Sequence, residues 1–228
     1  MSLFDKGFAF ICEGDTEKVF YIELCGYLFE KHGYVFEKKV DNERADIFYI
    51  AKKDAKPFLL KFHAVGTITQ VPHSGNWFEN RCVELHKDEV NEWTAFLCYD
   101  TDSYTDDISK FYEGDWLILR NRLSSLAHIV DVAASATIED VLLTDLTGIC
   151  RYYSIPMPSE PLTFGRSGKA KLKMLLRPHS IPYHSGTRAQ PLIQSLDMEC
   201  LLSNKLLPIF KVEETLFASE VSKKEGKK

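Results

Sequence analysis

The chain has 228 residues, of which 45% are hydrophobic, which is enough for one large globular domain or for a domain with a small appendage. It shows neither a secretory leader nor an apolar run of the roughly 18 residues that a membrane span needs, so we expect a soluble cytoplasmic protein without membrane contacts. The formal net charge of −5 argues against a nucleic-acid partner for the chain as a whole, although one segment departs strongly from it. The cysteines lack the paired spacing of zinc sites and are expected to be reduced thiols: Cys12, Cys25, Cys82, Cys98, Cys150 and Cys200.

The first predicted element is a buried strand that ends on a carboxylate. Residues 8–12, Phe-Ala-Phe-Ile-Cys, form the near-continuous apolar run of a strand that helices cover on both faces. Glu13 follows directly, and a helix is predicted over about 15–32. In open α/β sheets the carboxyl ends of the strands face the crevice where ligands bind, so the position of Glu13 favours chemistry over packing.

The middle of the chain repeats this pattern. An extended segment is predicted at 46–50, a strand or short helix at 58–62, a loop at 64–76 and an amphipathic helix at 78–90. The next apolar strand, 94–99, ends on Asp100 and Asp102, which one threonine separates. Parallel neighbours in one sheet would bring these two carboxylates to the edge that carries Glu13.

Strands and helices continue to alternate after these acids. A helix is predicted at 115–126, a strand at 128–132 and a helix at 137–152. This alternation predicts an α/β fold with a mainly parallel sheet flanked by helices. In the last helix Glu139 and Asp145 lie beside the apolar stripe and are expected to face something other than solvent, whereas Asp140 is expected to face away. Asp145 fits a hydrogen-bonded helix residue better than a ligand.

The composition changes near residue 156, where prolines interrupt the helical pattern. Residues 161–196 contain no Asp or Glu and carry a charge of +6, whereas the remaining chain carries −11. A helix is predicted at 168–176, and Lys169 and Lys173 share one of its faces. We expect the basic side chains to bind nucleic-acid phosphates, the alternative being an ordinary solvated face: Arg166, Lys169, Lys171, Lys173, Arg177 and Arg188.

Three regions follow from these patterns. Residues 1–155 are predicted to form the catalytic α/β domain and residues 156–220 a basic, helical C-terminal extension. The lysine-rich end, 221–228, is predicted to be a disordered tail. The oligomeric state, with a homodimer among the options, stays open.

Acidic side chains from separate segments are expected to meet at one edge of the sheet: Glu13, Asp100, Asp102 and Glu139. Carboxylates gathered in one place repel one another strongly unless a cation lies among them. Oxygen ligands suit Mg²⁺ or Mn²⁺ rather than zinc. Such ions commonly bind substrate phosphates and stabilise the leaving oxygen, so the acids predict a metal-dependent reaction at phosphorus.

Two of these motifs resemble a known family. Glu13-Gly14 after the first strand, together with Asp100-Thr101-Asp102 after a later strand, is similar to the signature of the Toprim domain of topoisomerases, primases and several nucleases. The wider segment 12–17, Cys-Glu-Gly-Asp-Thr-Glu, which Phe-Tyr follows at 20–21, resembles the RloB-type and OLD-type Toprim proteins of bacterial phage defence systems. The resemblance spans about residues 7–153.

The resemblance implies a Toprim-like sheet and a Mg²⁺- or Mn²⁺-dependent endonuclease that hydrolyses phosphodiester bonds of DNA or RNA, tRNA included, in phage defence. Asp100 and Asp102 would then be metal ligands, Glu13 a ligand or the general acid or base, and Glu139 the further downstream acid of the OLD type. No ATPase domain accompanies the motifs in these residues, so a partner ATPase or another defence protein stays open.

Other interpretations of the same residues stay open. Glu13 would in one of them only favour the start of the following helix, and Asp100 or Asp102 would only cap a turn. The main alternative function is a Toprim-fold module that binds nucleic acid or nucleotides, as a sensor, without cleaving them. A further alternative is a phosphotransfer enzyme, in which an aspartate of Asp100-Thr101-Asp102 would accept a phosphoryl group.

Overall fold

A computed structural model describes residues 3–53, 57–66, 68–100, 114–134, 137–162, 167–203, 206 and 208–218. Two predicted site residues, Asp102 and Arg166, lie outside the described residues, as does the predicted tail at 221–228. Within the described parts of the chain, no helix combines the length and the apolar character that crossing a membrane requires.

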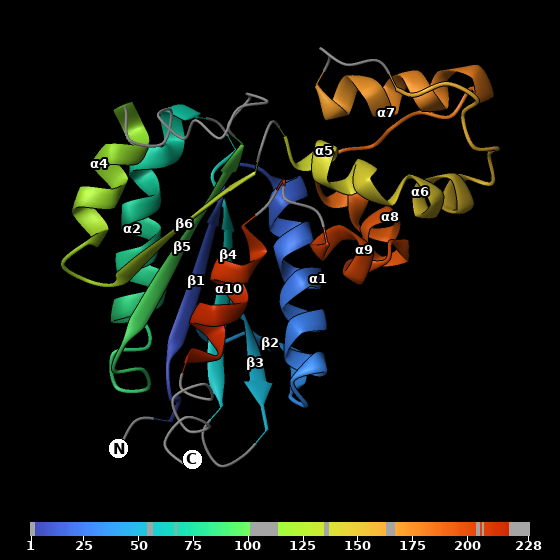
Figure 1. Cartoon of the computed structure of the whole chain (residues 1–228). Helices are drawn as coiled ribbons and strands as arrows, with labels where there is room; N and C mark the ends of the chain where they lie inside the picture. The colour runs from blue at the N-terminus through green and yellow to red at the C-terminus, as the bar shows by residue number, and fades with distance from the viewer. Residues whose placement is uncertain are drawn as a thin grey trace, which may run out of the picture.

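Six strands of the described chain form one sheet with the spatial order β2-β3-β4-β1-β5-β6 (Figure 1). Their bounds are Gly7–Cys12 for β1, Val35–Asp41 for β2, Asp46–Lys52 for β3, Phe58–Ala64 for β4, Trp93–Asp100 for β5 and His128–Ala134 for β6. The strands β4, β1, β5 and β6 are parallel to one another, whereas β3 is antiparallel to both of its neighbours. The predicted α/β fold with a mainly parallel sheet is therefore confirmed.

The two strands that precede the predicted acids are neighbours at the centre of the sheet. Both β1 and β5 are buried along their whole length, as expected for strands that helices cover on both faces. They are parallel, with Cys12 opposite Cys98. Their carboxyl ends consequently lie side by side, and Glu13 and Asp100 come to the same edge of the sheet.

Helices cover both faces of this sheet (Figure 1). Helix α1 (Asp15–Lys31) and helix α10 (Ile209–Leu216) share a hydrophobic cluster with Phe8 and Phe10 on one face. Helices α2 (Ser74–Phe78) and α4 (Gly114–Leu123) share a second cluster with Ala9 and Ile11 on the other face. The alternation of side chains along β1 thus divides the core into two layers.

The remaining helical elements lie mainly in the second half of the chain. The 3₁₀ turns are η1 (Ile68–His73), η3 (Leu143–Asp145), η4 (Arg177–His179) and η5 (Gly186–Ala189), and η2 (Glu79–Glu84) is a π-helix. The α-helices are α5 (Ile138–Leu142), α6 (Leu146–Tyr153), α7 (Gly168–Leu176), α8 (Gln190–Ser195) and α9 (Met198–Leu202). In Figure 1 the helices α5 to α9 gather on one side of the sheet, next to α1.

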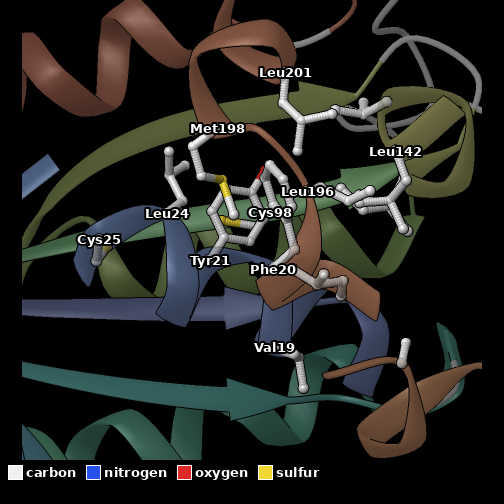
Figure 2. Packing of buried hydrophobic residues seen from close by; sticks show 14 of the residues in the cluster. Val19, Phe20, Tyr21, Leu24, Cys25, Cys98, Leu142, Leu196, Met198 and Leu201 are labelled. Carbon is white, nitrogen blue, oxygen red and sulfur yellow. The ribbon is translucent and has the colours of Figure 1, made fainter. Parts of the chain in front are cut away.

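The C-terminal segment is part of the main core. Figure 2 shows side chains of α1, β5, α5 and the C-terminal segment packed in one cluster: Phe20, Tyr21, Leu24, Cys98, Leu142, Leu196, Met198 and Leu201. The cysteines carry free thiols, as expected, and all except Cys200 are buried. The hydrophobic core therefore crosses the change of composition at residue 156.

Several predicted boundaries differ from the structure. The single helix predicted at 137–152 is divided into α5, η3 and α6, because the Asp145 carboxylate accepts a hydrogen bond from the Gly148 amide at 2.8 Å and so starts a new helix. The loop predicted at 64–76 contains η1 and most of α2, and the helix predicted at 78–90 is the shorter η2 followed by turns.

Candidate functional site

Glu13 and Asp100 meet at the carboxyl ends of β1 and β5. The Glu13 amide continues the ladder between these strands by donating to the Cys98 carbonyl at 2.9 Å. The side chain of Glu13 then turns to the end of β5, where its Oε2 accepts a hydrogen bond from the Asp100 amide at 3.2 Å. Asp100 itself is only 8% exposed. The convergence of acids from two strands, which the sequence predicts, is seen for this pair, while Asp102 lies outside the described residues.

Glu17 is a third carboxylate beside this pair. Helix α1 begins after Gly14, which has extended backbone angles, and Glu17 lies in its first turn. The amides of Glu17 and Gly14 both donate to the Glu17 carboxylate. A Cβ atom at position 14 would lie 2.8 Å from Oε2 of Glu17, so any other residue in place of Gly14 would displace that carboxylate.

Glu139 joins the group from α5. The Thr137 side chain caps this helix at the Asp140 amide, which places Glu139 in the first turn with only 7% exposure. The Tyr183 hydroxyl donates a hydrogen bond to Oε1 of Glu139 at 3.2 Å. We refer to Glu13, Glu17, Asp100 and Glu139 as the acid cluster.

Three members of the acid cluster interact electrostatically through Glu17. The pKa of Glu17 is raised to about 7, mainly by burial and also by the charges of Glu139 and Glu13, against the two backbone hydrogen bonds that lower it. Burial is also the main cause of the raised pKa of Glu139, which the Tyr183 hydrogen bond and the Lys169 charge oppose. Glu17 thus links Glu13 at the end of β1 with Glu139 on α5.

Tyr183 and Gly186 hold the C-terminal segment against the acid cluster. Burial raises the pKa of Tyr183, and the charges of Glu139 and Glu17 add to this effect, so the phenol stays a hydrogen-bond donor at neutral pH. Three residues further on, the Gly186 amide donates to Oγ1 of Thr16 at 2.7 Å, which fixes η5 to the first turn of α1. Gly186 has a φ of +71°, which favours glycine at this position.

The prediction that Asp140 faces away from the protein is wrong. Asp140 is 6% exposed, and its Oδ2 accepts hydrogen bonds from the Thr137 hydroxyl at 2.8 Å and from the Gly168 amide at 2.9 Å. Its Oδ1 lies 2.6 Å from Nζ of Lys171. Asp140 therefore connects α5 to the start of α7, because the first turn of a helix leaves amides without intrahelical partners.

The predicted phosphate-binding residues fall into two groups. Lys171 is largely buried, and its ammonium is ion-paired with Asp140, so this side chain stabilises the packing of α7 on α5. The other described members are exposed on α7, η4 and η5: Lys169, Lys173, Arg177 and Arg188. Lys169 lies near enough to Glu139 to lower its pKa, which places this lysine at the border of the acid cluster. Arg166 is outside the described residues.

Asp145 has the structural function that the sequence favours for it. It is 6% exposed, and its two carboxylate oxygens accept hydrogen bonds from the Gly148 and Asp197 amides, each at 2.8 Å. Both Glu139 and Asp145 are thus buried, as expected, but only Glu139 belongs to the acid cluster.

The chemistry of the acid cluster fits a hard divalent cation, because its side chains offer carboxylate oxygens that are mostly buried. In the part of the chain that the structure describes, no group of three acidic, histidine or cysteine side chains is arranged to hold a metal ion. Asp102, the fourth acid of the predicted set, is not among the described residues.

Two residues of this region are absent from the set predicted by sequence. Glu17 follows Glu13 by four positions, a spacing that could have indicated a carboxylate returning to the strand end after one helical turn. The sequence indicates Tyr183 less clearly than Glu17. Tyr183 is part of a short polar segment, and its place beside Glu139 depends on the tertiary fold.

Comparisons with known proteins add little at this point. No family model and no curated protein matches the chain. Among solved structures, a futalosine hydrolase mutant of Helicobacter pylori strain 26695 is 9% identical over 88% of this chain and 99% of that chain, with a TM-score of 0.26. Such a low TM-score carries no argument about fold or function.

Proposed function

We propose that this protein is a Toprim-like endonuclease that hydrolyses phosphodiester bonds of DNA or RNA with Mg²⁺ or Mn²⁺. The observation that carries the proposal is the contact between Glu13 and the Asp100 amide, at the carboxyl ends of two adjacent parallel strands. In open α/β sheets ligands bind at this edge. A function in phage defence, with a partner ATPase or another defence protein, follows from the resemblance of residues 12–21 and is part of the proposal.

The acid cluster would hold the cation through Glu13, Asp100 and Glu139, together with Asp102, and Glu17 adds a carboxylate beside them. A bound divalent ion would supply positive charge that polarises the phosphodiester and stabilises the leaving oxygen. The protein's own contribution is positioning. The Asp100 amide orients Glu13, and the Tyr183 hydroxyl orients Glu139.

The basic side chains beside the cluster support a polyanionic substrate. Lys169 lies at the border of the cluster, and Lys173 lies one helical turn further along α7. Neither is held in an ion pair among those seen in the described chain, in contrast to Lys171. Exposed lysines of this kind bind the phosphate backbone without distinguishing its bases, so DNA and RNA are both candidates.

A cleavage assay tests the proposal. Wild type is incubated with labelled plasmid, single strands and total tRNA, each with Mg²⁺, Mn²⁺ or EDTA, next to Glu13→Gln and Asp100→Asn. We expect cleavage that EDTA abolishes and that each substitution reduces by at least about a hundredfold, since each removes a charge that positions the ion. Glu30→Gln, at the exposed far end of α1, is the matched control and should cleave like wild type.

Two results would contradict the proposal. Cleavage that persists in EDTA would show that the reaction does not require a metal ion. Binding of nucleic acid without cleavage under every metal condition would instead favour the silent binding or sensor module.

A further inference from the structure

A pair of stacked aromatic rings lies near the carboxyl end of β4, the strand next to β1. The His63 and Trp77 rings are stacked, with centroids 4.6 Å apart and an interplanar angle of 13°. His63 is near the end of β4 and Trp77 is on α2, and both are only partly buried. The other two tryptophans, Trp93 and Trp116, are 4% and 1% exposed and belong to the core.

Backbone pairing places this ring pair next to the acid cluster. His63 is opposite Ile11 in the parallel pairing of β1 and β4, and the ladder continues until the Gly66 amide donates to the Glu13 carbonyl at 2.9 Å. With strands about 4.8 Å apart and a rise of about 3.3 Å per residue, the Cα atoms of His63 and Glu13 are separated by roughly 8 Å. Ile11 and His63 share one face of the sheet, and Glu13 follows Cys12 directly at the carboxyl end of β1.

A positive charge accompanies the rings. The pKa of His63 is lowered to about 4, mainly by burial and also by the nearby Lys18 ammonium, so the imidazole is neutral at physiological pH. Lys18 lies in the first turns of α1, directly after Glu17, and is partly exposed. The arrangement therefore combines a flat, uncharged aromatic pair with one cation, beside carboxylates suited to a metal ion.

We propose that His63 and Trp77 form a stacking platform for an unpaired nucleobase, with Lys18 beside the adjoining phosphate, so that the site takes single-stranded nucleic acid. This inference rests on the proposed nuclease function, because the acid cluster would act on the same strand. Aromatic side chains and cations are the common means of holding single strands. A base within a duplex already stacks on its neighbours and cannot lie on a protein ring without leaving the helix.

Tryptophan fluorescence tests the platform in the absence of cleavage. Wild type in EDTA is titrated with a single-stranded oligonucleotide and with the duplex of the same sequence, and tryptophan emission and its quenching by acrylamide are recorded. Because Trp93 and Trp116 are buried, acrylamide reaches them poorly, so the quenchable part of the emission reports Trp77. We expect the single strand to quench the emission and to protect it from acrylamide, and the duplex to do so much less.

Variants measure the contribution of the rings to affinity. Anisotropy of a labelled single strand at fixed salt should show binding weakened roughly tenfold to a hundredfold in Trp77→Leu and in His63→Leu. Phe210→Leu is the control, because Phe210 is a 59% exposed aromatic residue of α10, on the other face of the sheet. Circular dichroism establishes that each variant is folded, and the fluorescence titration of wild type needs no variant.

The outcomes separate this inference from the proposed function. Saturation with the single strand without a change in tryptophan emission would overturn the platform, as would equal effects of single strand and duplex. Cleavage by wild type with unaltered binding by Trp77→Leu and His63→Leu would overturn the platform and leave the nuclease intact. If the single strand quenches and protects the tryptophan emission but is not cleaved with any metal, the platform would be supported and the proposed nuclease function contradicted.

Discussion

Glu17 lies one helical turn after Glu13, and its carboxylate turns back to the amide of Gly14 while the charges of Glu13 and Glu139 act on it. Two hydrogen bonds from the backbone favour its ionised form, but burial and the neighbouring carboxylates outweigh them. The proton therefore stays on Glu17 up to a pH of about 7 in the folded protein, whereas it leaves near 4.5 in the unfolded chain. A cation among the acids would relieve the repulsion that adds to the effect of burial.

This difference predicts how stability depends on pH. Because the folded-state pKa is raised, the free energy of unfolding should fall as pH rises from about 4.5 to about 7, by a maximum of about 3 kcal/mol from Glu17 alone. Glu17→Gln removes the titrating group and should lessen the fall by about this amount. Urea unfolding in EDTA at pH 5 and pH 8 measures it, with Glu30→Gln as the control. An identical pH dependence in Glu17→Gln and wild type would contradict the electrostatic description of the cluster.

At the scale of elements, α7 is attached to α5 through one buried carboxylate. Asp140 accepts from the Gly168 amide and pairs with Lys171, while a Cβ atom at Gly168 would lie 2.3 Å from the Asp140 nitrogen. The two helices thus approach so closely that only glycine fits between them. This contact sets the position of the exposed Lys169 relative to Glu139.

Asp140→Ala should therefore destabilise the protein. It leaves the Lys171 ammonium and the Gly168 amide without their acceptor, and loss of one partner of a buried ion pair typically costs about 3–5 kcal/mol. Because Lys171 is 12% exposed and can reach water in part, we expect about 3 kcal/mol. Urea unfolding checks this value, and Glu160→Ala, at an exposed site before α7, should change the stability by less than about 0.5 kcal/mol. A loss for Asp140→Ala as small as that of the control would contradict the attachment.

Elements with local signals were predictable from the sequence. The apolar runs of β1 and β5 identified the centre of the sheet, and α7 spans the residues predicted for it, with Ser167 capping its start. The edge strand β2 was missed because its sequence, Val-Phe-Glu-Lys-Lys-Val-Asp, is largely exposed and lacks an apolar run. Its lysines are typical of edge strands, where charged side chains disfavour pairing with strands of other chains.

The candidate site was likewise predictable only where local sequence patterns indicate it. Glu13 and Asp100 follow strands whose pairing the pattern indicates, so their meeting could be expected. Tyr183 could not be expected, because its hydroxyl reaches Glu139 across 44 positions of sequence and no local spacing encodes that contact. The break of the helix at Asp145 has a similar cause, since the second oxygen of that carboxylate accepts from the Asp197 amide in the C-terminal segment.

At the scale of the whole molecule, the residues after 156 complete the core and contact the acid cluster through Tyr183. Buried side chains from this segment belong to the same cluster as α1 and β1: Leu172, Leu176, Ile193, Leu201, Val212 and Leu216. Each contributes roughly 1.5–3 kcal/mol by leaving water, and the total is comparable to the whole stability of a typical domain. The change of charge at residue 156 is therefore a change of surface, while the interior continues across it.

A truncation tests this conclusion. We expect residues 1–155, produced alone, to lack cooperative unfolding and to bind a dye for exposed apolar surface, because the loss of the segment uncovers one face of the sheet and of α1. Residues 1–220, which omit only the lysine-rich end, are the control and should unfold like the full chain. Urea unfolding followed by circular dichroism, together with dye fluorescence, distinguishes the two. Cooperative unfolding of 1–155 with native-like stability would show that the α/β part folds by itself, and the C-terminal segment would then be an extension of a complete domain.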